Sequence, residues 1–145
     1  MTNDEQTLSK VVPFLLAILV CDSGTVDQNS GKKTLVGIFD QVIARKFPTS
    51  RSLSVYFKLS DAQGKYKFRV QYAQVKTGKI LAGAETRDVV TIESRLDIFD
   101  SLISFPMDLP IPVPEAGQYE FRLDANNMFL GRIAINALQA KDIEE

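Results

Sequence analysis

The apolar run VVPFLLAILVCD, from Val11 to Asp22, constrains the fold of this chain more than any other stretch. It is the longest apolar segment of the sequence, and three structures compete for it: a secretion signal, a membrane span and a buried strand. A signal peptide needs a basic segment in front of it, whereas residues 1–10 carry two acidic side chains and one basic side chain. The run also has about half the length that a membrane-spanning helix needs.

The composition of the run favours a strand. Val, Ile and Leu dominate it, Pro13 stands near its start, and the turn-forming residues 22–24 end it. This pattern is typical of a strand that is buried on both faces. We therefore expect the strand at the centre of a folded, cytoplasmic protein. A charge placed at Leu16 or Ile18 is expected to unfold that protein, because a central strand leaves neither side chain in water.

The totals of the chain predict a globular domain and exclude several chemistries. The chain has 145 residues, no histidine and one cysteine, Cys21. The absence of histidine removes the commonest general base and metal ligand, and one cysteine allows neither an internal disulfide nor a multi-thiolate zinc site. Cys21 is interpreted as an inert core residue, and Asp97 and Asp100 as solvated acids beside a turn. We expect no enzyme activity, no metal and no cofactor.

Two alternating segments predict a β-hairpin in the middle of the chain. Apolar and polar side chains alternate through residues 53–60 and again through residues 66–75. Such period-two patterns on both sides of the turn-forming residues 61–64 predict a half-buried antiparallel pair. A slip of one residue would place Lys and Arg in the core, so the register of each strand is well defined.

Short strands separated by turns account for much of the remaining chain. Residues 34–47 predict two strands broken near Asp40, with a bulge or a close backbone approach at Gly37. Residues 105–114 place proline on alternate positions, which predicts an edge strand or an extended run covering the sheet. Residues 93–104 fit a helical turn and an irregular strand equally, and this choice stays open.

The last clear unit joins two alternating strands through Asn126 and Asn127, which tolerate the positive φ values of a two-residue turn. Eight or nine short strands, with turn signals about every ten residues, predict an all-β chain with an immunoglobulin-like antiparallel β-sandwich. We expect a flexible N-terminal tail over residues 1–10, a single sandwich domain over residues 11–138, and a C-terminal tail over residues 139–145.

The stretch EAGQYEFRL, residues 115–123, resembles the penultimate strand of immunoglobulin-like domains. The resemblance implies that Tyr119 is the tyrosine-corner residue, whose hydroxyl binds nearby backbone. Phe121 stands where antibody domains have a cysteine, and the chain has no tryptophan. The resemblance therefore implies the topology and no immune role.

A longer resemblance covers nearly the whole domain. The segments LLAILVCD, GKKTLVGIFD, SLSVYFKLSDAQGKYKFRV and GQYEFRLDANN resemble a family of small uncharacterised bacterial proteins. That family has no assigned activity. The resemblance implies a free-standing bacterial domain and offers no catalytic residue.

Charge is distributed unevenly along the chain. Residues 31–79 contain eleven Lys or Arg and two acidic residues, although the net charge of the whole chain is −1. By strand alternation, a basic face on the predicted hairpin consists of Tyr56, Lys58, Lys65, Lys67 and Arg69.

This charge pattern has three interpretations. An exposed tyrosine among cations resembles a platform for single-stranded nucleic acid. A solvated strand face that discourages edge-to-edge pairing has the same composition and is favoured over it. Thirdly, the basic region could pair with the acidic region of another copy or of another protein. We expect a non-catalytic interaction module that binds a protein, itself or another, with nucleic acid or another polyanion as the alternative partner and no membrane.

Overall fold

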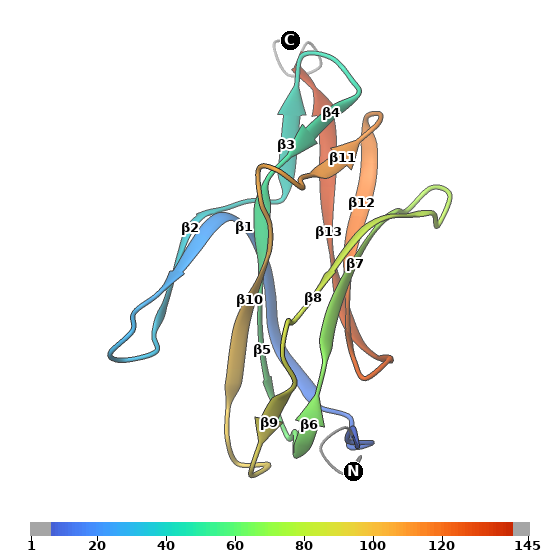
Figure 1. The fold of residues 1–145 in the computed structure, drawn as a ribbon. Coiled ribbons are helices and arrows are strands. Elements are labelled where there is room, and N and C mark those ends of the chain that lie inside the picture. The colour runs from blue at the N-terminus through green and yellow to red at the C-terminus, as the bar shows by residue number, and fades with distance from the viewer. Residues whose placement is uncertain (1–6, 141–145) are drawn as a thin grey trace.

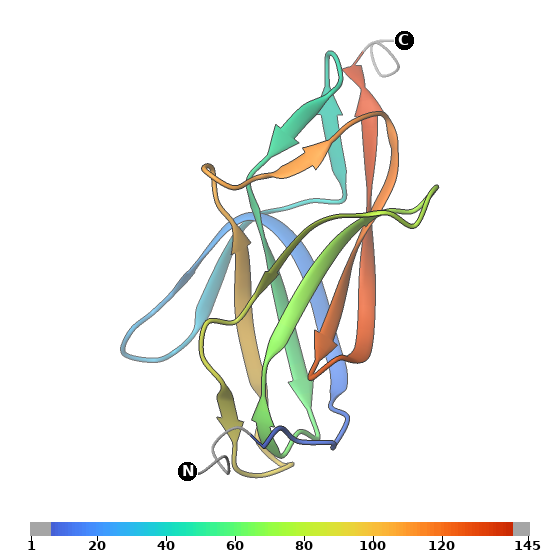
Figure 2. The same ribbon diagram turned by 45° about the vertical axis from the view of Figure 1, so that its right-hand side comes forward.

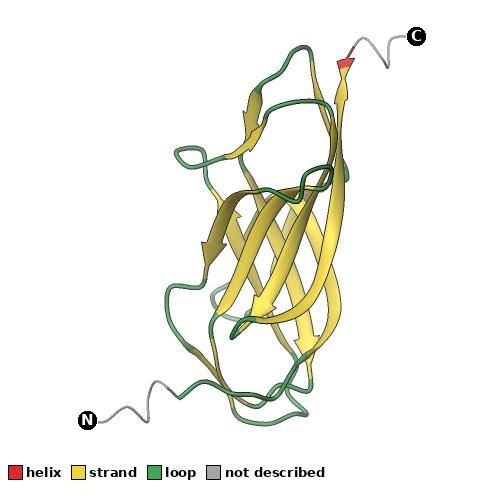
Figure 3. Ribbon diagram, turned by 90° about the vertical axis from the view of Figure 1, so that its right-hand side faces the viewer, coloured by secondary structure: helices red, strands yellow, loops and turns green. Residues whose placement is uncertain are grey.

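The computed structural model describes residues 7–140 as two packed β-sheets (Figure 1). Strands and their connecting turns make up nearly all of this part of the chain (Figure 3). The predicted all-β, immunoglobulin-like antiparallel sandwich is confirmed. The described residues form thirteen strands where eight or nine were expected, because several strands are only three or four residues long.

The two sheets of the sandwich contain four and five strands. In spatial order, the first sheet contains β10 (Phe99–Phe105), β5 (Leu53–Ser60), β1 (Phe14–Val26) and β2 (Lys33–Ile38). The second sheet contains β3 (Gln41–Ala44), β13 (Met128–Gln139), β12 (Gly117–Ala125), β7 (Phe68–Gln74) and β8 (Ile80–Glu85). The two smaller sheets pair β4 (Thr49–Arg51) with β11 (Ile111–Val113) and β6 (Gly64–Tyr66) with β9 (Val90–Ile92).

The two strands predicted to form a hairpin lie in opposite sheets, so that prediction is wrong. β5 pairs with β1 and β10, whereas β7 pairs with β12 and β8. Between them, Asp61 and Gly64 adopt φ values of 60° and 114°, and β6 pairs with β9, so the chain passes from one sheet to the other. Alternation correctly predicted which face of each strand is buried. Alternation did not predict the pairing partner, because the buried faces of β5 and β7 meet across the core whether or not the two strands are hydrogen-bonded neighbours.

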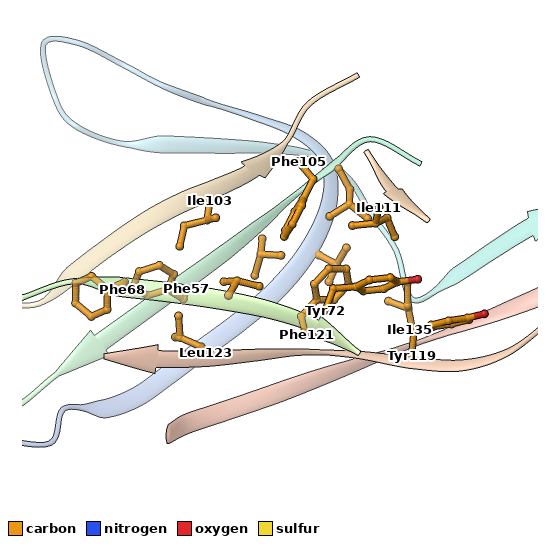
Figure 4. Packing of buried hydrophobic residues seen from close by; sticks show 14 of the residues in the cluster. Phe57, Phe68, Tyr72, Ile103, Phe105, Ile111, Tyr119, Phe121, Leu123 and Ile135 are labelled. Carbon is orange, nitrogen blue, oxygen red and sulfur yellow. The ribbon is translucent and has the colours of Figure 1, made fainter. Parts of the chain in front are cut away.

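The core lies between the two sheets and is rich in aromatic rings (Figure 4). Phe57 of β5 and Phe68 of β7 have ring centroids 5.1 Å apart. Phe105 contacts Phe121 across the sandwich at 6.0 Å. Burying each large apolar side chain contributes roughly 1.5–3 kcal/mol before conformational entropy is subtracted. These contacts hold the two sheets face to face.

The apolar run at β1 is only partly buried, so the expectation of burial on both faces is wrong. Phe14 and Leu16 are 62% and 46% exposed, whereas Val20 is fully buried. The N-terminal half of β1 lies at the margin of its sheet, because β2 pairs only with residues from Cys21 onwards. A register shift beside Leu16 also interrupts the ladder with β5. A charged side chain at position 16 could therefore reach water, and we no longer expect a charged substitution of Leu16 to unfold the protein.

The β12–β13 hairpin confirms the predicted turn and the tyrosine corner. Asn126 and Asn127 adopt φ values of 52° and 67° and join the two strands as a two-residue turn. The Tyr119 hydroxyl donates a hydrogen bond to the carbonyl of Glu115 (2.7 Å) and accepts one from the Glu115 N–H (3.2 Å). Phe121 is fully buried, as its alignment with the inward-facing cysteine of antibody domains implied.

The N-terminal segment is fixed to the domain from Ser9 onwards. The Ser9 N–H donates to the carbonyl of Lys65 (2.9 Å), and the Asn126 side-chain amide donates to the carbonyl of Ser9 (2.9 Å). The buried Tyr66 hydroxyl donates to the carbonyl of Val11 (2.7 Å). Ser9, placed in the expected tail, is therefore part of the folded structure. Residues 1–6 and 141–145 lie outside the described part of the chain.

Several shorter predictions are resolved as well. The ambiguous segment, residues 93–104, divides into a turn and the strand β10. In the turn, the Asp97 N–H donates to the carbonyl of Ser94 (3.0 Å).

The predicted break near Asp40 separates β2 from β3, and here the chain changes sheets. The proline-rich segment contributes a short strand, β11, in a peripheral two-stranded sheet, so the edge-strand prediction is confirmed there. Residues 7–140 include no helix with the length and hydropathy of a membrane span.

Candidate interaction site on the arm of the first sheet

β1 and β2 continue beyond the sandwich as a two-stranded arm, defined here as residues 22–38 (Figures 1 and 2). The first strand, which was expected to end at residues 22–24, therefore continues to Val26. The Asp27 carboxylate accepts hydrogen bonds from the Ser30 hydroxyl (2.6 Å) and N–H (2.9 Å), which hold its pKa below the ordinary value. The turn at the tip of the arm is thus closed by its own side chains.

The base of the arm is fixed by a cluster around Arg51. Its guanidinium donates to the Asp22 carboxylate (2.7 Å) and lies 4.6 Å from the centre of the Phe39 ring, a cation–π arrangement. Gly37 adopts a φ of 68°, and the Asp22 carboxylate occupies the space where a side chain at position 37 would lie. Glycine is therefore required here, in agreement with the predicted close approach.

A second cluster ties the arm to the outer face of the first sheet. Lys33 of the arm forms an ion pair with Asp100 of β10 (Nζ to Oδ1, 2.5 Å), and the Tyr56 hydroxyl of β5 donates to the other carboxylate oxygen of Asp100 (2.8 Å). We call Lys33, Asp100 and Tyr56 the latch. Beside it, Leu102 packs so closely against Gly24 that a Cβ there would overlap the leucine methyl groups.

The electrostatics of the latch keep its hydrogen bonds formed at neutral pH. Burial raises the pKa of Tyr56 to about 12, and the hydrogen bond and charge of Asp100 act in the same direction. Burial also acts to raise the pKa of Asp100. The hydrogen bonds from Lys33 and Tyr56, together with the charges of Lys33 and Lys58, outweigh it and leave that pKa below its ordinary value. The carboxylate is therefore charged while the phenol stays protonated.

The face of the arm that points away from the sandwich is apolar and open to solvent. Val36 and Ile38 are 54% and 57% exposed, whereas the half-exposed Val26 pairs with Lys33 and lies on the opposite face of the arm. The outer edge of β2 pairs with no strand among residues 7–140, and no charged residue occurs from Thr34 to Ile38. At the base, Ile38 also borders a shallow apolar depression of about 270 Å³ between β1 and β13. The arm thus combines a free strand edge with exposed β-branched side chains.

The five residues of the predicted basic face do not share one surface. Tyr56 and Lys58 belong to β5 in the first sheet, where Tyr56 is part of the latch and Lys58 lies next to it. Arg69 belongs to β7 in the second sheet, and Lys65 and Lys67 lie in and just after β6. Since the buried faces of β5 and β7 meet in the core, their outward side chains point in opposite directions. The structure therefore brings Tyr56 and Lys58 together and separates them from Arg69.

Tyr56, Lys67 and Arg69 form contacts with acidic side chains of the chain. Tyr56 is held in the latch. Lys67 pairs with Glu85 (3.2 Å), and Arg69 pairs with Asp124 (2.8 Å). The platform for single-stranded nucleic acid depended on one shared face, and the placement of β5 and β7 in different sheets contradicts that face.

Groups that could carry chemistry are dispersed. Cys21 is fully buried with its thiol 3.7 Å from the carbonyl of Ser54, and burial together with the charge of Asp22 raises its pKa. Within residues 7–140, no three His, Cys, Asp or Glu side chains group as metal ligands. The buried Glu120 is bound by Arg122 (2.5 Å).

The sequence prediction missed the arm, although a signal for it was present. Thr25-Val26 and KTLVGI, residues 33–38, are rich in β-branched side chains and flank the turn-forming stretch DQNSGK. That pattern is typical of a hairpin with a longer loop. The first strand was predicted to end at Asp22 because the apolar run ends there. The strand itself continues, but its residues become polar where it leaves the core.

Two facing sheets, a tyrosine corner at Tyr119 and the parallel pairing of β3 with β13 define an immunoglobulin-like β-sandwich domain. The chain belongs to a family of unknown function (DUF6941), whose match covers residues 16–138. The resemblance to an uncharacterised family is thereby confirmed. A comparison with curated proteins finds no match.

Solved structures that resemble this chain include the C-terminal domain of wzt, at a TM-score of 0.52 and 14% identity, covering 88% of this chain and 74% of that chain. The CARDB domain of a Pyrococcus furiosus protein, in complex with di-metal ions, has a TM-score of 0.40 and 12% identity and covers 90% of this chain and 98% of that chain. A β-glucosidase from Listeria innocua has a TM-score of 0.41 and 10% identity, covering 84% of this chain and 16% of that chain. At these identities the first match supports the sandwich fold alone, and the other two carry no argument.

Proposed function

We propose that this chain is a non-catalytic protein-interaction module and that the arm is its docking element. The observation that carries the proposal is the uncharged outer edge of β2, which stands clear of the sandwich with Val36 and Ile38 exposed. Natural sheets protect such edges with charges, prolines or covering segments. On β2 the one charged side chain, Lys33, is turned inward to Asp100.

The geometry suits an extended partner segment that adds to the edge. In strand addition, main-chain hydrogen bonds supply affinity and side chains on alternate positions supply specificity. The extended part of the free edge spans residues 33–36, since the positive φ of Gly37 interrupts the strand. Thr34 and Val36 face solvent there. We therefore propose a partner segment that presents uncharged, β-branched or other apolar side chains to this face.

The contacts at both ends of the arm lower the cost of docking. Ordering a flexible element on binding consumes part of the interaction free energy. Here Arg51 fixes the base, and the latch fixes the other end near the tip, where Lys33 pairs with Val26, before any partner binds. The proposal includes a reducing, cytoplasmic location, which the single buried Cys21 supports.

Two isoleucines allow a matched test. Ile38 on the arm and Ile43 on β3 have the same side chain and similar exposure, 57% and 52%. The purified wild-type protein, Ile38→Glu and Ile43→Glu would each capture proteins from an extract of the source cells. Captured candidates would then be titrated with the purified proteins. We expect a partner that binds the wild type and Ile43→Glu alike and binds Ile38→Glu at least tenfold more weakly.

Equal affinity of all three proteins for every recovered partner would contradict docking on the arm. Thermal unfolding provides the folding control, because an exposed substitution away from the core changes stability by only about 0.5 kcal/mol.

A further inference from the structure

Two arginines lie directly opposite one another on the outer face of the second sheet. Arg122 of β12 pairs in register with Arg132 of β13. Phe121 and Leu123, on either side of Arg122, are fully buried in the core, and successive side chains of a strand point to opposite faces. Arg122 and Arg132 therefore point outwards together. Like charges that are directly opposite on neighbouring strands repel each other and destabilise the pair.

The other charged side chains of this face are matched in pairs. Arg69 of β7 pairs with Asp124 of β12 (2.8 Å), and Lys67, which precedes β7, pairs with Glu85 of β8 (3.2 Å). The remaining charged residues of β7, β8, β12 and β13 are the two opposed arginines and Glu120. One carboxylate therefore lies beside two guanidinium groups, and the face carries one positive charge in excess.

Glu120 binds one of the two arginines tightly and the other loosely. The Glu120 side chain is only 7% exposed, and its Oε2 accepts a hydrogen bond from Arg122 Nε (2.5 Å). Its Oε1 lies 3.7 Å from Arg132 Nη1, beyond hydrogen-bonding distance. Within residues 7–140, the terminal nitrogens of Arg122 and the guanidinium of Arg132 donate no hydrogen bond. The Arg132 side chain is 68% exposed, so an anion from solvent can reach these donors.

Gln71 continues the row on the other side of Arg122. It pairs in register with Arg122 and with Gly83 of β8, and its side-chain amide donates no hydrogen bond to the described residues. Gly83 has no side chain, and the sheet has a shallow hollow of about 430 Å³ there, which Gln71 and Arg69 also line. We call Arg132, Arg122 and Gln71 the arginine row. It presents uncommitted N–H donors from three neighbouring strands to solvent.

We propose that the arginine row binds the oxyanion group, a phosphate or a carboxylate, of a small ligand. Guanidinium groups bind such groups through paired, charge-assisted hydrogen bonds. The anion neutralises the excess charge and removes the repulsion between Arg122 and Arg132. The buried Glu120 orients Arg122 before the ligand binds, which lowers the cost of ordering. This inference goes beyond docking on the arm, because the arm belongs to the first sheet.

A titration followed by NMR tests the site with two simple probes. Sodium phosphate and sodium acetate would each be added to the wild type, Arg132→Gln and Arg45→Gln, at an ionic strength held constant with sodium chloride. Arg45→Gln is the matched control: it removes the same charge from an exposed arginine just after β3. We expect phosphate to shift the amide resonances around residues 122 and 132 with equal affinity in the wild type and Arg45→Gln. Binding to Arg132→Gln should be about tenfold weaker.

Thermal unfolding separates a ligand site from a structural ion pair. Without phosphate and at low salt, Arg132→Gln should be slightly more stable than the wild type, because the repulsion with Arg122 is gone. Phosphate should raise the unfolding temperature of the wild type and not that of Arg132→Gln, since a ligand stabilises only the folded state that binds it. An arginine that serves to hold Glu120 would give the opposite result, a variant less stable than the wild type.

Three outcomes overturn the proposal: equal phosphate affinity of the wild type and Arg132→Gln, equal weakening in Arg45→Gln, or destabilisation by Arg132→Gln without phosphate. The two probes also distinguish the sources of the oxyanion. Tighter binding of phosphate supports a phosphate ester as the ligand, and tighter binding of acetate supports a carboxylate. Ile38→Glu should bind both probes like the wild type, which keeps failure of this proposal distinct from failure of docking on the arm.

Discussion

Two antiparallel hairpins of this molecule have the same secondary structure and opposite surroundings. β12 and β13 are joined by a tight Asn-Asn turn, and the inward residues Tyr119 and Phe121 are fully buried. β1 and β2 extend beyond the sandwich, where Val36 and Ile38 are more than half exposed. An isolated two-stranded hairpin is marginally stable in water. The first is stabilised by the aromatic core, and the second depends on a few contacts at its base and its latch.

The difference shows that the fold keeps its stabilising contacts apart from its exposed apolar arm. The inward face of β12 cannot change without opening the core. The outward face of the arm is more than half exposed at Val36 and Ile38, so changes there leave the core intact. Substitutions in the buried hairpin should therefore destabilise the whole domain, whereas substitutions in the arm should have small, local effects.

The largest effect is expected in the buried hairpin. Phe121→Ala removes a ring that contacts Phe105 across the sandwich and Tyr72 beside it. The cavity and the lost burial should lower the free energy of unfolding by about 3–5 kcal/mol, measured by urea denaturation. A loss below about 1 kcal/mol would mean that the core is not packed as described. Ile38→Glu should leave the denaturation midpoint nearly unchanged.

An intermediate effect is expected at the tyrosine corner. Tyr119→Phe keeps the ring and removes the hydroxyl that binds both backbone groups of Glu115. The free energy of unfolding should fall by about 1–2 kcal/mol, the range for a lost hydrogen bond that leaves backbone groups less satisfied. Denaturation of Tyr66→Phe offers a comparison at the other end of the sandwich, where the hydroxyl binds the carbonyl of Val11. If the stability of Tyr119→Phe equalled that of the wild type, water would be shown to replace the hydrogen bonds of the Tyr119 hydroxyl without any loss of free energy.

The smallest global effect is expected at the latch, where the response should be local. Asp100→Asn removes the ion pair with Lys33. Stability should fall by less than about 1 kcal/mol, while hydrogen exchange in residues 22–38 should become about fivefold faster and exchange in β12 should not change. Lys67→Met, which breaks a surface pair with Glu85, is the control and should leave the arm unchanged. Faster exchange throughout the sandwich would show that the arm and the core open together.

The latch also predicts the pH at which the arm loosens. The pKa of Asp100 lies below its ordinary 3.8 in the folded protein. A depressed pKa gives stabilisation that is present above the ordinary value and lost as the pH falls through the folded-state value. Amide chemical shifts of the arm should therefore be constant from pH 7 to pH 5 and change below about pH 4. The same titration of Asp100→Asn should show a smaller change around Lys33, while the change at the tip persists because Asp27 has a lowered pKa of its own.

The buried face of each strand was predictable from the sequence, and the identity of its neighbour was not. Leu53, Val55 and Phe57 were assigned to the core from alternation alone, and all are buried. Alternation carries no information on which strand lies alongside. The connection at Asp61–Gly64 resembles a tight turn in composition, yet it includes the short strand β6 and crosses between sheets.

The candidate site was only partly predictable for the same reason. Tyr56 and Lys58 were selected as outward polar residues; Tyr56 is part of the latch, and Lys58 lies beside it. Their decisive partner, Asp100, is 44 residues away from Tyr56 in sequence. Lys33 lies on the arm, and the arm forms only because β1 and β2 remain paired beyond Asp22. Contacts that join distant segments through a sheet leave no local pattern in a single sequence.

The position of the arm between β1 and β3 bears on how members of this family can diverge. The Phe39 N–H donates to the carbonyl of Val20 in the first sheet, and the carbonyl of Asp40 accepts from the Asn136 N–H in the second, so the chain changes sheets within two residues. The arm is thus an insertion ahead of that crossing, with both of its ends anchored. Lengthening it costs little, since doubling a loop adds only about 0.6 kcal/mol of closure entropy. Members of the family could therefore differ in the length and sequence of the arm while keeping the same β-sandwich.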